Sequence, residues 1–170
     1  TLSFHDNMPA MWSSPLGDGS ENHTPKIAVK FTPESYPVFT KQVQILVSNE
    51  TGKDQLFNLS AYPDKGGMPD EETAIFTIKH MKVPQTTGEL VSYDLPSTQV
   101  SEGSVWLVIE WPEKPLKEQG GNNSFRVNVD AKLDHPDRHL FHRYTDGGWI
   151  DFQSVSDTMG DAIFNLILVN

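Results

Sequence analysis

The sequence contains no cysteine, which excludes disulfide bonds, thiolate zinc sites and cysteine nucleophiles. It also lacks a long apolar run. The longest, residues 162–169, is interrupted by Asn165, whereas a membrane-spanning helix needs roughly 20 apolar residues. We therefore expect no membrane insertion. A chain of 170 residues is nevertheless long enough to bury one sizeable core without disulfides.

Basic residues are scarce: 13 lysines and arginines stand against 23 acidic residues, for a formal net charge of −10. Nucleic acids and anionic membranes would be repelled by such a surface, so we expect neither as a partner. The acidic residues are spread along the chain. This indicates a solvated surface, with cation binding as the alternative.

Signatures of catalysis are missing as well. There is no Gly-x-Ser-x-Gly elbow, no His-Glu-x-x-His pair, no phosphate-binding loop and no Gly-x-Gly-x-x-Gly turn. We therefore expect that the chain is not an enzyme. Serine, histidine and aspartate are all present, so a hydrolase of unrecognised type stays open as an alternative.

What the sequence does have is alternation of apolar and polar residues at a period of two. Val43, Ile45 and Val47 share one face of a segment, and Phe125 and Val127 share one face of another. This period is typical of β-strands, because successive side chains leave opposite faces of the pleat. We expect strands at residues 26–31, 41–48, 55–62, 74–82, 89–95, 104–111, 124–130, 139–144 and 162–169, and a short one near 149–152.

Clusters rich in glycine, asparagine and proline separate these segments, as at 48–53 and 120–124. Many short strands with regular turns predict an all-β, antiparallel sandwich that is jelly-roll-like. We expect residues 26–170 to form this single domain, and residues 1–25 to be a loop-like segment or linker. Because the sequence starts at Thr1 without a leader, we expect a mature chain or a piece of a longer one.

The order of strands and turns resembles that of jelly-roll-type accessory modules in large secreted bacterial proteins. These modules often adjoin protease domains or precede C-terminal sorting signals. The resemblance runs from residue 26 onward. It is carried by AVKFTPESYP at 28–37, VQILV at 43–47, LSAYPDKGGMP at 59–69, ELVSYDL at 89–95, SVWLVIEW at 104–111, YTDGGW at 144–149 and AIFNLILV at 162–169.

The resemblance implies a non-catalytic role, such as spacing, folding assistance, adhesion or substrate targeting. Its partners would be neighbouring domains of a larger polypeptide, and a glycan or cell-surface polymer. The expected location is extracellular or the cell envelope. Acceptor sequons at Asn22, Asn49, Asn58 and Asn122 add weak support for export.

Residues 64–72 combine two glycines with several carboxylates, including Asp64, Asp70 and Glu71. Calcium prefers six to eight oxygen ligands on a backbone that can curl, so these three residues are candidate calcium ligands. Lys65 would repel a cation, and the spacing is not that of an EF-hand. The favoured interpretation is an ordinary turn with solvated charges.

Trp149 follows two glycines and has Tyr144, Asp146 and Asp151 as neighbours. An exposed tryptophan with polar residues around it could stack on a sugar ring, so these four residues are a candidate carbohydrate site. Aromatic residues also dominate sandwich cores. We favour packing over sugar contact, and we expect Trp111 in the core and Trp106 on the opposite face of the same strand.

Overall fold

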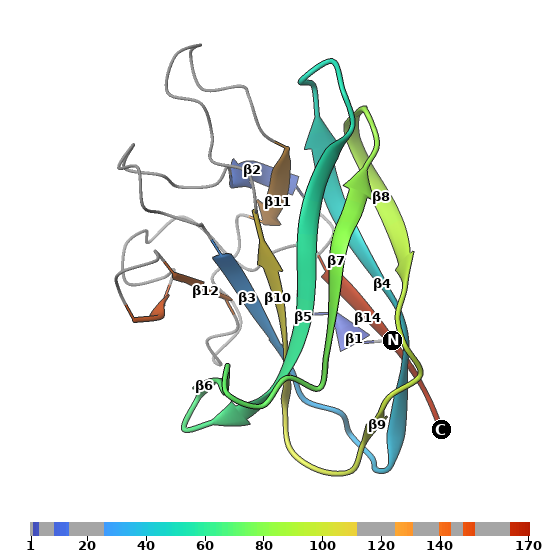
Figure 1. Cartoon of the computed structure of the whole chain (residues 1–170), viewed down its shortest axis with the longest axis vertical. Helices are drawn as coiled ribbons and strands as arrows, with labels where there is room; N and C mark the ends of the chain where they lie inside the picture. The colour runs from blue at the N-terminus through green and yellow to red at the C-terminus, as the bar shows by residue number, and fades with distance from the viewer. Residues whose placement is uncertain are drawn as a thin grey trace.

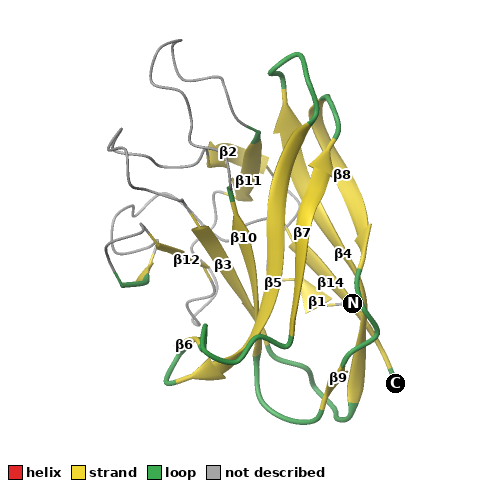
Figure 2. Cartoon of the chain, in the orientation of Figure 1, coloured by secondary structure: helices red, strands yellow, loops and turns green. Residues whose placement is uncertain are grey.

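The structure is a computed structural model that describes residues 2–3, 9–13, 26–111, 125–130, 140–143, 148–151 and 164–170 (Figure 1). Figure 2 shows these residues as strands and loops, with no helix among them. The described part therefore holds no helix that could cross a membrane.

The strands are β1 (Leu2–Ser3), β2 (Pro9–Ser13), β3 (Lys26–Phe31), β4 (Val38–Asn49), β5 (Gln55–Lys65), β6 (Met68–Pro69), β7 (Phe76–Val83), β8 (Thr86–Asp94), β9 (Gln99–Val100), β10 (Val105–Glu110), β11 (Arg126–Asp130), β12 (Leu140–Arg143), β13 (Ile150–Asp151) and β14 (Phe164–Val169).

The first sheet is organised around the long strand β4. Strands β8, β9, β11 and β14 all pair with β4, while β1 extends the sheet beyond β14 and β2 extends it beyond β11. Every pairing is antiparallel, with Val43 opposite Tyr93 and Ile45 opposite Phe164. Since opposed residues share a face, this register places the apolar set of β4 on the inner side.

The second sheet has the order β13-β12-β3-β10-β5-β6, with β7 also paired to β5. Its centre is β10, which lies between β3 and β5 and places Leu107 opposite both Val29 and Ala61. Strands β3, β5, β10 and β12 belong to this sheet, and β4, β8, β11 and β14 belong to the first. The chain therefore crosses repeatedly between two layers (Figure 1), as jelly-roll winding requires. The predicted antiparallel β-sandwich is confirmed.

One apolar core fills the space between the two sheets. Val43, Ile45 and Val47 are buried on one side, and the odd-numbered residues of β10 are buried on the other, together with Trp111. Trp111 stacks on Phe125 with ring centroids 5.0 Å apart. The predicted alternation and the predicted core position of Trp111 are both confirmed.

Most predicted strands lie within a few residues of the observed bounds, but β1, β2, β6 and β9 were not expected. Strand β2 belongs to the segment expected to be loop-like because it is rich in serine, glycine, asparagine and proline. A proline is tolerated at the first position of a strand, which is where Pro9 stands. Residues 9–13 pair with β11 and so extend the first sheet.

The pairing of β5 with β7 is interrupted by a register shift between Phe57 and Leu59. Opposite the shift, His80 adopts a left-handed backbone conformation with φ of 58°. Its N–H donates to the Asn58 side-chain oxygen at 3.1 Å. The result is a bulge in β7, which within the described residues pairs only with β5.

The connection from β4 to β5 depends on Asn49, whose side chain is 1% exposed. Its Nδ2 donates to the carbonyl of Lys53 at 3.0 Å and to that of Val83 at 2.9 Å. Its Oδ1 accepts from the Thr51 hydroxyl at 2.7 Å. Because both amide protons are used internally, the Asn49 sequon could carry a glycan only if this network were broken.

We expect Asn49→Ala to lower the free energy of unfolding by about 2–3 kcal/mol, because it leaves buried carbonyls without a donor. Gln42→Ala is the matched control on β4. Gln42 is half-buried and its Nε2 donates to Asp94 in an exposed hydrogen bond, so the loss should stay below about 1 kcal/mol. Urea midpoints measure both. Equal losses would contradict the role assigned to Asn49.

Candidate functional site

The outward face of the second sheet carries a second apolar cluster. Ala28 and Trp106 are 0% exposed and Val108 is 2% exposed, although all three point away from the main core. Tyr62 and Trp149 are partly buried and pack against them. The outer face of an antiparallel sheet is ordinarily polar and solvated, so this covered apolar patch sets the region apart.

Register explains which side chains surround Trp106. Lys30 on β3 and Tyr62 on β5 stand directly opposite Trp106, one on each side. Asp64 lies two residues beyond Tyr62 and therefore points to the same face. The Lys30 ammonium lies 5.5 Å from the centroid of the Trp106 ring, within cation–π range.

Asp64 connects these groups through its carboxylate. Its Oδ1 accepts from the Trp106 indole N–H at 2.8 Å and lies 3.1 Å from the Lys30 ammonium. Its Oδ2 accepts from the backbone N–H of Gly67 at 3.2 Å. Burial would raise the pKa of Asp64, but hydrogen bonds from Trp106, Lys30 and Gly67 and the charge of Lys30 outweigh it, so the pKa is lowered. The carboxylate is ionised at neutral pH.

We expect Asp64→Asn to lower the free energy of unfolding by about 1–2 kcal/mol at pH 7, because charge-assisted hydrogen bonds are lost. A carboxyl whose pKa is lower in the folded state adds stability above its unfolded pKa, here close to 3.8. That contribution disappears as the pH falls through the folded value. The difference between wild type and variant should therefore shrink below about pH 4.

The measurement is urea unfolding across this pH range. Asp94→Asn, which changes an exposed carboxylate on β8, is the control and should alter stability by under about 0.5 kcal/mol. A difference for Asp64→Asn that stayed constant with pH would show that the lowered pKa contributes nothing.

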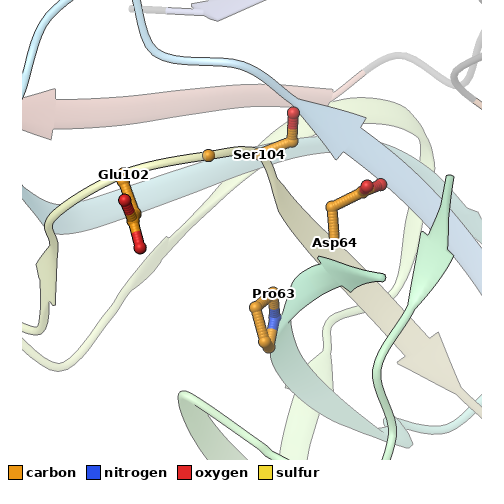
Figure 3. A pocket seen from close by; sticks show the side chains of 5 residues that line it. Pro63, Asp64, Glu102 and Ser104 are labelled. Atoms are coloured by element: carbon orange, nitrogen blue, oxygen red, sulfur yellow. The ribbon is translucent and has the colours of Figure 1, made fainter. Parts of the chain in front are cut away.

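A cavity of about 420 Å³ lies beside this network, lined by Pro63, Asp64, Glu102, Gly103 and Ser104. Figure 3 shows Pro63 and Asp64 on β5, and Glu102 and Ser104 on the segment that leads into β10. Its volume lies within the roughly 300–1,000 Å³ of ligand pockets.

Hydrogen bonds from the loop between β3 and β4 fix one wall of the cavity. The Tyr36 hydroxyl donates to the Gly103 carbonyl at 2.6 Å. The hydroxyls of Thr32 and Ser104 lie 2.8 Å apart and share a hydrogen bond. The backbone N–H of Asp64 donates to the Ser104 carbonyl at 3.1 Å, which holds β5 against the same segment. The cavity is therefore formed where three separate stretches of chain meet.

Each of the three predicted calcium ligands forms an ion pair with a different lysine. Asp64 pairs with Lys30, Asp70 lies 3.6 Å from the Lys65 ammonium, and Glu71 lies 2.7 Å from the Lys26 ammonium. Within the described residues there is no group of three or more histidine, aspartate or glutamate side chains placed to hold a metal ion. Each carboxylate is already neutralised by a lysine.

We therefore expect millimolar calcium to leave the melting temperature unchanged, because only a ligand of the folded state would raise it. The double variant Asp64→Ala/Asp70→Ala is the control in case calcium does raise the melting temperature. A rise that a chelator reverses, and that the double variant abolishes, would establish the loop as a calcium site.

The predicted carbohydrate residues lie only partly within the described structure. Trp149 is half-buried and packs against the Trp106 cluster. The backbone of Asp151 belongs to β13, where it stands opposite Phe141 of β12. Tyr144 and Asp146 lie outside the described residues, so whether the four residues come together stays a prediction.

Sequence reasoning did not identify Lys30, Glu102 or Ser104 as site residues. Lys30 alternates with apolar residues along its strand, which marks it as outward-facing but not as the partner of Trp106. Glu102 and Ser104 stand in an ordinary turn sequence. The sequence alone does not reveal the order of strands in the sheet. These residues come together because β3, β10 and β5 are neighbours.

No family model, curated protein or solved structure matches this chain. The candidate site is therefore defined by its own geometry: a covered aromatic face, an ionised carboxylate held by three donors, and a polar cavity beside it.

Proposed function

We propose that this chain is a non-catalytic accessory module of an exported bacterial protein, and that it binds through the outer face of its second sheet. The observation that carries the proposal is the Trp106 cluster on that face. Tyr62 and Trp149 each keep part of their surface exposed there. Partly exposed aromatic residues beside fixed charges are typical of contact surfaces.

The chemistry of Asp64 favours binding over catalysis. A general acid or base works best with a pKa near the operating pH, whereas the surroundings of Asp64 lower its pKa. The hydroxyl of Ser104 is hydrogen-bonded to Thr32, which is not a base that could activate it. Both groups are positioned as fixed polar contacts.

Export is proposed from the resemblance and from the sequons, although the buried Asn49 does not strengthen the sequon argument. The partners would be neighbouring domains of the same polypeptide, or a polymer at the cell surface. The absence of cysteine is compatible with export because one core of this size needs no disulfide.

A second candidate function is carbohydrate binding with Trp149 at its centre. The observation that favours it is that the Trp149 side chain is only partly covered by the outer cluster. The exposed part of such a ring could stack on a sugar, with Tyr144, Asp146 and Asp151 as polar neighbours.

Substitution of Trp149 distinguishes the two functions. If the ring chiefly packs on the Trp106 cluster, Trp149→Ala should lower the free energy of unfolding by about 3 kcal/mol, the lower end for large-to-small changes in packed sites. Wild-type protein should then not be retained on insoluble polysaccharides. Denaturant midpoints and a polysaccharide pull-down measure the two properties.

Trp149→Phe is the control, since it keeps an apolar ring and should restore most of the stability. A Trp149→Ala protein that is fully stable but has lost polysaccharide binding would replace the accessory role with the carbohydrate function. Turnover of chromogenic ester, glycoside or peptide substrates by the purified chain would contradict the non-catalytic assignment.

A further inference from the structure

Among the described residues, the charged side chains that line the cavity beside Asp64 are both carboxylates. Asp64 and Glu102 contribute carboxylates, which only accept when ionised. Pro63 has no N–H, and the Ser104 hydroxyl already shares a hydrogen bond with Thr32. Within the part of the chain that the structure describes, no lysine, arginine or histidine belongs to the lining. A ligand that brings its own donors and a positive charge therefore complements the two carboxylates.

The balance of charges around the cavity also favours a positively charged ligand. Lys30 neutralises Asp64, and Lys65 lies between Asp70 and Glu72 at 3.6 and 3.4 Å. Among the described residues no lysine or arginine forms an ion pair with Glu102. One negative charge in the cavity wall is therefore left without a counter-charge from the described protein.

From these observations we propose that the cavity binds an organic cation with several N–H donors, namely the guanidinium or primary ammonium group of an arginine or lysine side chain. Glu102 supplies the ion pair. Asp64 is held in place by three donors and retains acceptor capacity, since an ionised carboxylate has about four lone-pair sites. The Pro63 ring offers an apolar surface to the aliphatic stem of the ligand.

Other ligand classes fit less well. An anion would be repelled by Glu102, and a neutral sugar would form no ion pair with it. Calcium would need about six to eight oxygen ligands, whereas the described residues contribute two carboxylates to this cavity and one of them is already bound to Lys30. The cation site shares Asp64 with the Trp106 cluster, but its test probes Glu102 and the 103–104 backbone and does not depend on the proposed function.

The test is a titration of the isotope-labelled whole chain, followed by NMR at the backbone amides of Gly103 and Ser104. The probes are Nα-acetylarginine N-methylamide, the corresponding lysine compound, and the corresponding citrulline compound, which is neutral but close in shape to arginine. We expect saturable shifts at millimolar arginine or lysine probe and none with citrulline.

Glu102→Gln should weaken binding of the cationic probes about tenfold, the equivalent of about 1.4 kcal/mol. The variant should fold normally, because Glu102 is exposed. Glu89→Gln on β8 removes one exposed negative charge away from the cavity and should leave the affinity unchanged. The proposal is overturned by equal binding of citrulline, by unchanged affinity of Glu102→Gln, or by no saturable shift at Gly103 and Ser104.

Discussion

Strand β10 is buried on both faces, and the arrangement of the second sheet depends on this constraint. Its odd-numbered residues close the core between the sheets, while Trp106 and Val108 are just as inaccessible on the outer side. A buried indole N–H needs an acceptor, since an unpaired polar group in an apolar setting is costly. Asp64 meets that need and also accepts from Gly67 in the 64–72 loop, while strand register places Lys30 and Tyr62 on either side of Trp106.

Asp64 consequently belongs to two parts of the molecule. One of its oxygens closes the hydrogen bond to Trp106 on the sheet face, and the residue also lines the cavity at the end of β5 (Figure 3). A ligand in the cavity would therefore contact a group whose position is set by the packing of the sheet. Such support from rigid strands gives a binding site a fixed geometry, which reduces the ordering cost on association.

Much of the fold could be predicted from the sequence, because alternation at period two fixes both strand identity and the buried face. That reasoning placed Ile45 and Trp111 in the core and Trp106 on the opposite side. It could not supply strand neighbours, which depend on contacts between distant segments. The loop at 64–72 looked like a set of free carboxylates because Lys26 and Lys30, which pair with Glu71 and Asp64, arrive from β3.

The bulge at His80 bears on how this protein behaves at high concentration. A regular edge strand offers a straight row of backbone donors and acceptors on which another chain can add, the first step towards fibrils. In β7 the extended backbone is interrupted midway by the left-handed conformation of His80, which bends the strand. Lys79 and Lys82, both exposed, flank the break. The irregularity, with these two lysines, thus works against edge-to-edge assembly.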